Sequence, residues 1–261
     1  MAQAGMPDAD ILPEAAILSL SDLTGALRLG WQDFRRAPAF GLLFSAFYVA
    51  GGLVIAAVAM ALGRDWWLIP FVLGFPLIAP FAAVGLYEVS RRIEAGLPLD
   101  WRRVIGVVVA QKDRQVPSMA MVILLLFMFW VFVAHTIFAL FLGTASLTHI
   151  TSSAAMLTEG RGLAMLITGT LVGGAFAAVL YAFTVVGLPL LLDREVDFIT
   201  AIIASVQALL QNLGVLAVWA ALIAGLLFLA ILPAFLGLFV VLPVLGHASW
   251  HLYRRVMPDA D

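Results

Sequence analysis

Long apolar stretches without charged residues alternate with short charged segments along this chain. A bilayer core about 30 Å thick needs roughly 20 apolar residues per helix. The charge-free stretches provide six such helices, because the last stretch is too long for one helix and must fold back. Proline interrupts helical hydrogen bonding, so we expect this fold-back at Ile231–Pro233, extending as far as Gly237. The predicted spans are therefore about 38–62, 66–90, 117–142, 162–191, 213–232 and 234–254.

Composition supports an all-α, polytopic membrane bundle and excludes several other classes of protein. Apolar residues make up 64% of the chain and charged residues only 11%, whereas a soluble domain is about half apolar. We therefore expect the lipid bilayer as its first partner, and no nucleic acid, because the chain carries no basic surface. With 0 cysteines, disulfides, thiolate metal sites and cysteine nucleophiles are also excluded.

The basic residues are distributed unequally between the two ends of the predicted spans. Of the 14 basic residues, only Arg64 and Arg161 fall on one side of the membrane, and the others fall on the side that carries both termini. The positive-inside rule places that richer side in the cytoplasm. The sequence therefore predicts a multi-pass protein of the bacterial inner membrane with both termini cytoplasmic.

Three similar segments precede the first, third and fifth spans. Each begins with an aspartate followed by an apolar residue, at Asp22, Asp100 and Asp197, and a glutamine follows ten or eleven positions later. Aspartate is a good helix N-cap, and the apolar residues recur at helical spacing. We expect three amphipathic helices in the cytoplasmic interface. The residues expected to anchor them are Trp31, Arg35, Arg36, Trp101, Arg102 and Arg103.

The even-numbered spans repeat less completely. The second and sixth spans share a pattern at their ends. Eleven and twelve positions after a proline, Pro80 or Pro243, comes an arginine pair, Arg91–Arg92 or Arg254–Arg255. The predicted membrane domain, 19–255, thus divides into three copies of an amphipathic helix plus a hairpin. The copies cover about 20–96, 97–194 and 195–255. They follow a disordered acidic tail over 1–18 and precede a short tail over 256–261.

Two histidines in the sixth span suggest metal chemistry. His247 and His251 lie four residues apart, on one helix face. Two imidazoles at this spacing can share one Zn or Cu ion, with Glu88 or Asp193 as a third ligand. Hydrogen bonding across the bundle is the other interpretation. We expect no cofactor, and Zn, Cu or haem is the alternative.

The same residues form a predicted polar ring near the cytoplasmic mouth of the bundle. Its members are Glu88, Asp193, His247, His251 and Arg254. Glu88 precedes two arginines by three and four positions, so an ion pair is the simplest interpretation. A carboxylate at the membrane edge can instead relay protons or bind a cation.

Two further features lie inside predicted spans. His135 is a lone histidine of the third span, where one hydrogen-bond partner is expected. Gly169, Gly173 and Gly174 form a small-residue face in the fourth span, which favours close helix packing.

Three segments carry a resemblance to a known family: Gly246–Arg254, Gly85–Arg92 and Trp31–Pro38. With them the chain, from about Ser19 to Arg255, resembles a bacterial family described only as predicted integral membrane proteins of unknown function. Some members are labelled cytochrome c oxidase subunit I. This label implies a haem–copper oxidase core, which is a larger subunit. Such a core has more helices and more histidine ligands than the six predicted spans and 4 histidines of this chain.

No hydrolase, nucleotide-binding or metalloprotease motif is present. We therefore expect that the protein is not an enzyme and has no catalytic residues. Transport or permeation of a small solute, lipid or ion is the first hypothesis. A metal- or haem-related accessory factor for a respiratory oxidase is the second. An intramembrane scaffold, with a membrane-protein partner or a second copy of the chain, is the third.

Overall fold

The computed structural model describes residues 14–62, 69–142 and 160–258, and every regular element in these ranges is a helix. The all-helical prediction is thereby confirmed. The elements in chain order are α1 (Leu20–Arg36), α2 (Pro38–Leu62), α3 (Ile69–Glu94), α4 (Trp101–Ala110), the 3-10 turn η2 (Gln111–Asp113), α5 (Val116–Leu142), α7 (Gly160–Thr184), α8 (Gly187–Asp193), α9 (Phe198–Gln211), α10 (Leu213–Ile231) and α11 (Leu238–Val256).

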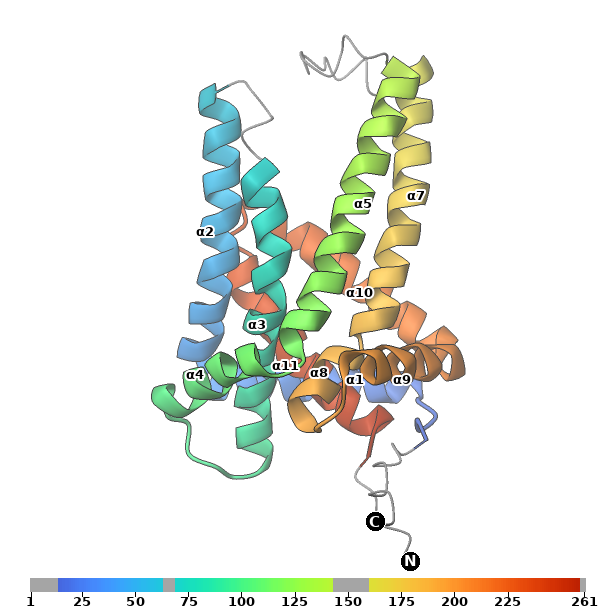
Figure 1. The fold of residues 1–261 in the computed structure, drawn as a ribbon. Helices are drawn as coiled ribbons and strands as arrows, with labels where there is room; N and C mark the ends of the chain where they lie inside the picture. The colour runs from blue at the N-terminus through green and yellow to red at the C-terminus, as the bar shows by residue number, and fades with distance from the viewer. Residues whose placement is uncertain (1–13, 63–68, 143–159, 259–261) are drawn as a thin grey trace, which may run out of the picture.

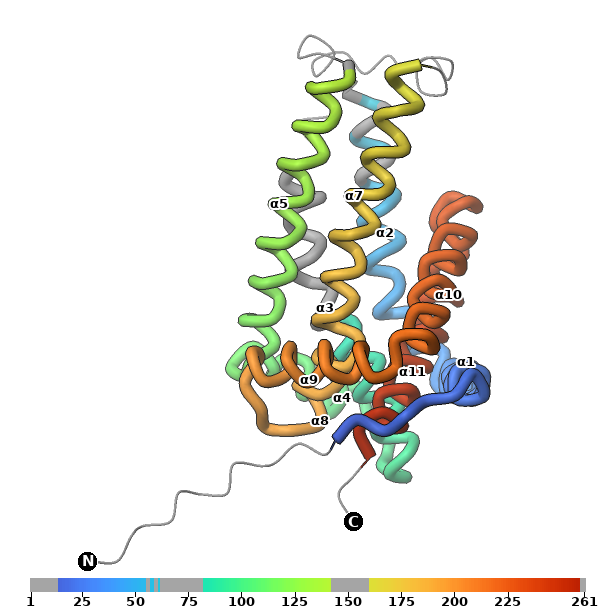
Figure 2. Tube along the Cα trace, turned by 90° about the vertical axis from the view of Figure 1, so that its right-hand side faces the viewer, coloured from blue at the N-terminus to red at the C-terminus, as the bar shows by residue number. Residues whose placement is uncertain are grey.

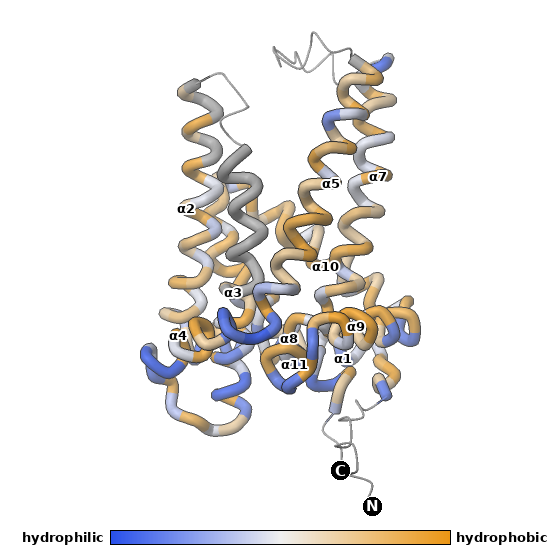
Figure 3. Tube along the Cα trace, in the orientation of Figure 1, coloured by the Kyte–Doolittle hydropathy of each residue, from blue (hydrophilic) through white to orange (hydrophobic). Residues whose placement is uncertain are grey.

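The helices form two groups of different orientation. The crosswise layer, α1, α4 and α9, lies at one end of the molecule, roughly perpendicular to the long helices α2, α3, α5 and α7 (Figure 1). The α10–α11 hairpin extends less far from this layer than α5 and α7 do (Figure 2). Hydrophilic residues gather at the crosswise layer, and the long helices are mostly hydrophobic (Figure 3).

Several helices are suited to cross a membrane. Over the described residues, three segments are long and apolar enough: Val116–Phe141, Gly160–Asp193 and Leu213–Ile231. The helix pair Leu20–Arg36 and Pro38–Val54, bent by 99°, raises this to as many as four. The chain is thus a helical protein with three to four candidate spans, and the count of six stays a prediction.

Side-chain caps start the crosswise helices, as the sequence predicts for two of them. Asp100 accepts a hydrogen bond from the Arg102 nitrogen at 2.7 Å, and Asp197 accepts one from the Ile199 nitrogen at 2.9 Å. Hydrogen bonds from Thr200 hold the pKa of Asp197 below its usual value.

The predicted cap of the first crosswise helix is wrong. Helix α1 begins one turn earlier than Asp22, with Ser19 as its N-cap. Asp22 is the third helical residue, and its carboxylate accepts hydrogen bonds from the Ser19 nitrogen at 2.8 Å and the Ser19 hydroxyl at 2.6 Å. This is the reciprocal arrangement of a capping box, in which an acidic side chain bonds back to the cap.

The chain folds back between α10 and α11 where the sequence predicts. Helix α10 ends at Ile231 and α11 begins at Leu238, and Ala234 and Phe235 in the connection have positive φ angles of 51° and 65°. The fourth predicted span, 162–191, differs because it is interrupted after Thr184. Pro189 has no N–H to donate to the carbonyl of Val185, which accounts for the end of α7 there.

Helix α11 is the centre of the packing. It contacts α1, α2, α3, α8 and α10, and its side chains Trp250 and Tyr253 are each 1% exposed. The predicted tail over 1–18 lies partly outside the described residues, but its last residues pack against the bundle. Ala16 donates to the Val256 carbonyl at 2.8 Å and Leu18 donates to Asn212 at 2.7 Å. The two described ends of the chain therefore lie together.

Candidate functional site

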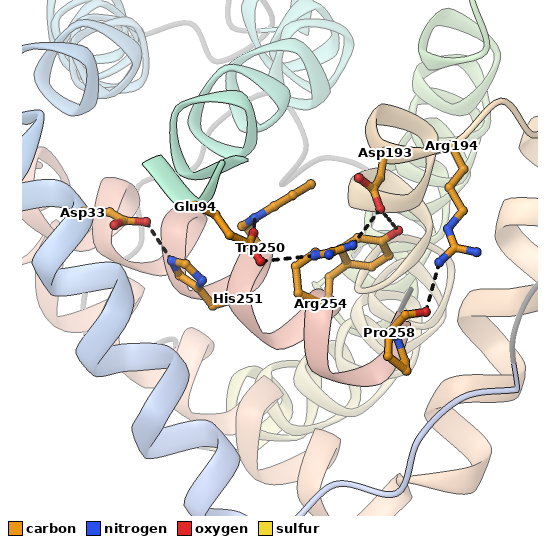
Figure 4. A network of polar contacts seen from close by, with 9 residues as sticks. Asp33, Glu94, Asp193, Arg194, Trp250, His251, Arg254 and Pro258 are labelled. Carbon is orange, nitrogen blue, oxygen red and sulfur yellow. Dashed lines mark hydrogen bonds and ion pairs between the residues drawn. The ribbon is translucent and has the colours of Figure 1, made fainter. Parts of the chain in front are cut away.

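A network of polar side chains surrounds the basic end of α11. Helices α1, α3, α8 and α11 all contribute to it, and Figure 4 shows part of it. Its residues are Asp33, Glu88, Ser90, Arg91, Arg92, Glu94, Asp193, His247, Trp250, His251, Tyr253 and Arg254.

Asp33 is the residue of the network that joins α1 to both α3 and α11. It lies on the buried face of α1 with Leu23, Ala26 and Gly30, at helical spacing, and this face packs on α11. One carboxylate oxygen of Asp33 accepts hydrogen bonds from the Ser90 hydroxyl at 2.8 Å and from His251 Nε2 at 2.7 Å. A buried carboxylate thus bonds to α3 and α11 at once.

His247 extends this chain into the interior. Its Nδ1 lies 2.8 Å from the Ser90 hydroxyl. Because Ser90 gives its one proton to Asp33, the serine oxygen must accept from His247, so a neutral His247 carries its proton on Nδ1. Its Nε2 is then a bare acceptor, which is buried and has no hydrogen-bond partner among the described residues. We call His251, Asp33, Ser90 and His247 the polar chain.

The polar chain contains the residue types of a hydrolase triad in a different order. In a triad the histidine lies between the serine and the carboxylate. Here the serine lies between Asp33 and His247, and Ser90 is 0% exposed. Such an arrangement does not activate the serine as a nucleophile. His247 and Ser90 can each take a proton on one side and release one on the other, and Asp33 can take the proton that Ser90 releases.

Glu88 pairs with both arginines, as its spacing predicts. Its carboxylate lies 2.7 Å from Arg91 Nε and 2.6 Å from Arg92 Nε. The side chain of Glu88 is 0% exposed, so these two cations offset its burial. Arg92 also donates to the Pro98 carbonyl at 3.3 Å, which ties the end of α3 to the following loop.

The remaining predicted residues meet on the opposite side of α11 (Figure 4). Asp193 accepts from the Tyr253 hydroxyl at 2.7 Å and lies 3.4 Å from Arg254. Arg254 also reaches Glu94 at 3.4 Å, and Trp250 donates to Glu94 at 2.9 Å. These contacts connect α8, α11 and the end of α3.

The structure therefore divides the five predicted residues among three groups of contacts: the two histidines in the polar chain, Asp193 with Arg254, and Glu88 with its arginines. His247 bonds to Ser90, His251 to Asp33, Glu88 to two arginines, and Asp193 to Tyr253 and Arg254. The two carboxylates considered as third metal ligands are thus held by other groups. Among the described residues, no group of three or more histidine or acidic side chains is arranged to hold a metal.

Sequence reasoning missed Asp33 and Ser90, which connect the two histidines. A signal for Asp33 was present, because it continues the helical spacing of Leu23, Ala26 and Gly30. Ser90 had no signal beyond its place in Gly85–Arg92, one of the segments that carry the family resemblance. Glu94 and Trp250, which bond to each other, were also missed.

The other singled-out residues lie away from this network. His135 bonds through Nδ1 to the Val131 carbonyl of its own helix at 2.7 Å. A Cβ at Gly173 would lie 2.9 Å from the Trp130 ring, whereas Gly169 and Gly174 face open space. All the predicted anchors are exposed, and Trp101 stacks on Phe40 with ring centroids 3.9 Å apart. These anchors are Trp31, Arg35, Arg36, Trp101, Arg102 and Arg103.

Comparison with known proteins agrees with the membrane character of the fold. Residues 68–193 match the model of a family described as predicted integral membrane protein (DUF2189). No curated protein and no solved structure matches the chain. The match confirms the resemblance to an uncharacterised membrane family, and it gives no support to the oxidase label. By this match, the segment 68–193 is similar to that family of predicted integral membrane proteins.

Proposed function

We propose that the protein is a six-span protein of the bacterial inner membrane and that it conducts protons through the polar chain. The proposal assigns no catalytic residue and needs no cofactor. The order of elements supports the membrane arrangement, since over the described residues a crosswise helix precedes a pair of further helices three times, in α1–α2–α3, α4–α5–α7 and α9–α10–α11. These three units correspond to the proposed repeats of an amphipathic helix plus a hairpin.

The proposed orientation can be tested directly because the chain contains 0 cysteines. Single cysteines are introduced as Lys112→Cys, on the side of the crosswise layer, and Arg161→Cys, at the far end of α7. Both positions are exposed. We expect a membrane-impermeant thiol reagent added to intact spheroplasts to label the variant at 161 and to label the variant at 112 only after lysis. The reverse pattern, or equal labelling before lysis, would contradict cytoplasmic termini.

The observation that carries the functional proposal is the continuous hydrogen bonding of the polar chain. A proton that binds Nε2 of His247 would release the Nδ1 proton to Ser90. Ser90 would pass its own proton to Asp33. Once Asp33 is protonated, His251 in the tautomer with its proton on Nδ1 can accept that proton at Nε2 and release the Nδ1 proton at the surface. The His251 side chain is 11% exposed, so the chain runs from the buried His247 to a group that reaches the surface. Ionisable groups inside membrane proteins commonly form such relays.

A cavity lined mainly by apolar residues lies beside α11, next to the inner end of the polar chain. The cavity has a volume of about 150 Å³ and lies between α2, α3, α10 and α11. Ser45, Tyr48 and Ser249 are the polar side chains in its lining, and the Ser45 hydroxyl is buried without a hydrogen-bond partner in the part of the chain that the structure describes. A water occupies about 30 Å³ of liquid volume, so the cavity has room for several. Gly246, next to His247, forms part of its wall.

Proton flux in reconstituted vesicles tests the proposal. Vesicles carry a pH-sensitive dye inside, and a potassium ionophore prevents charge build-up while an external acid pulse is applied. The change is Ser90→Ala, which removes the hydroxyl between Asp33 and His247. We expect proton entry through the wild-type protein and a loss of about a hundredfold in the variant, as for removal of one positioned proton-transfer group.

The matched control is Ser205→Ala. Ser205 is also 0% exposed, and its hydroxyl accepts from the Val186 nitrogen at 3.1 Å, away from the polar chain. This variant should conduct like the wild type. An equal loss of flux in both variants would mean that a buried serine supports only the fold. Flux through the Ser90 variant at the wild-type rate would exclude the polar chain as the route.

A further inference from the structure

The seam between α5 and α7 contains an elongated apolar hollow far from the polar network. Its volume is about 510 Å³. Ile137 and Met165 are buried at its floor, and Leu166 and Thr170 are exposed at its rim. The residues that line it are Trp130, Ala134, Ile137, Phe138, Met165, Leu166, Gly169, Thr170 and Gly173.

A second hollow continues the seam toward the crosswise layer. It has a volume of about 160 Å³ and extends along α7 as far as Leu180. Trp130 and Gly173 line both hollows, so they lie where the two meet. Together the hollows run along α7 from Met165 to Leu180, about 22 Å at the rise of a helix. This long, narrow and apolar shape suits an extended hydrocarbon chain better than a compact polar solute.

A positive charge lies beyond the outer end of the seam. Arg161 is exposed, and it precedes Met165, Gly169 and Gly173 by four, eight and twelve residues. At 3.6 residues per turn these positions follow a slanting row along α7 that turns by about 120° from Arg161 to Gly173. Arg161 and Gly173 are separated by about 18 Å along the helix. One leaflet of a bilayer core is about 15 Å deep. A lipid with its head group at Arg161 would therefore place its chain end near Trp130.

We infer that the α5–α7 seam binds one anionic phospholipid, with an acyl chain in the hollow and its phosphate at Arg161. Both helices are candidate membrane spans, so lipid is the medium in contact with the seam. The cation selects an anionic head group by charge complementarity, and an arginine can bond a phosphate through two N–H groups. This site lies apart from the polar chain and does not depend on proton conduction.

Photolabelling tests the inference with a defined probe. The protein is reconstituted in phosphatidylcholine vesicles that contain a little phosphatidylglycerol with a photoactivatable group near the end of one acyl chain. We expect saturable labelling of α5 and α7 peptides around Trp130 and Met165, located by mass spectrometry. Excess unlabelled phosphatidylglycerol should compete with the probe, and excess phosphatidylcholine should not.

Two leucine substitutions on α7 distinguish labelling by a lipid bound in the hollow from labelling by lipid that only contacts the helix surface. Gly169 lines the hollow and faces open space, so Gly169→Leu fills the hollow without a backbone clash. Gly174 also faces open space but does not line it, so Gly174→Leu is the matched control. We expect Gly169→Leu to abolish the saturable labelling and Gly174→Leu to retain it. Arg161→Gln should remove the preference for phosphatidylglycerol while leaving the labelled positions unchanged.

Labelling that does not saturate, or that spreads evenly over all lipid-facing helices, would overturn the inference. Equal labelling of the two leucine variants would also overturn it, because the hollow would then have no role. Unchanged head-group preference in Arg161→Gln would contradict the assignment of Arg161. A far-ultraviolet circular dichroism spectrum equal to that of the wild type shows that each variant retains its helices.

Discussion

Replacing Gly30 with alanine is expected to prevent the close docking of α1 on α11. A Cβ at position 30 would lie 2.6 Å from the Val244 carbonyl oxygen and 2.6 Å from the Ala248 nitrogen. Both atoms belong to the backbone of α11, so no rotation of a side chain can relieve the clash. The two helices must move apart, which also lengthens the hydrogen bonds that Asp33 makes from the same face of α1.

We expect Gly30→Ala to lower the free energy of unfolding by about 3 kcal/mol, at the upper end of the usual cost of overpacking. The measurement is unfolding by a denaturing detergent, followed by tryptophan fluorescence. Trp250 is 1% exposed in the packed core, so its emission should report the loss of this contact.

Gly214→Ala is the matched control, because Gly214 is also in a helix but a Cβ there meets nothing within 4 Å. Alanine has the higher helix propensity, so this variant should be as stable as the wild type or slightly more stable. Equal destabilisation in the two variants would show that the α1–α11 contact is not as close as described.

Replacing Asp33 with alanine is the second change with a large expected effect. The substitution leaves the Ser90 hydroxyl and the His251 ring without their acceptor in a buried site. An unsatisfied buried polar group costs about 1–3 kcal/mol, so two such groups should destabilise the fold by about 3 kcal/mol. The same detergent titration measures it.

Asp22→Ala provides the comparison on the same helix. Asp22 lies in the half-buried capping box of α1, where hydrogen bonds from Ser19 lower the pKa of its carboxyl group. It also forms a partly exposed ion pair with Arg255 of α11 at 2.7 Å, and such pairs contribute little to stability. Loss of a cap costs about 1 kcal/mol, so this variant should be destabilised less than Asp33→Ala. If the two aspartate variants lose equal stability, Asp33 has no special role in joining α1, α3 and α11.

The pattern of charges along the sequence predicted most of the helix positions. Bilayer length and charge-free stretches determine where long helices can begin and end, so α2, α5, α10 and the fold-back around Pro233 agree with the prediction. The interruption between α7 and α8 was not predicted. Pro189 marked the position, but a proline inside a membrane helix is common and does not by itself end it.

The polar chain was only half predictable. The spacing of His247 and His251 places both on one helix face, and both do reach the same group of residues. Their partners Asp33 and Ser90 are far away in the sequence, and only tertiary packing brings them together. Because α1 was interpreted as an interfacial helix, the packing of its buried face on α11 was not predicted. Small residues on this face allow the close contact between the two helices.

Proton conduction by the wild-type protein is the claim on which the functional account depends. The most direct measurement is the rate of internal acidification in vesicles that contain the purified protein, compared with protein-free vesicles of the same lipid. The account predicts a faster rate with the protein, because the polar chain passes protons between His247 and His251. Equal rates in the two kinds of vesicle would contradict it.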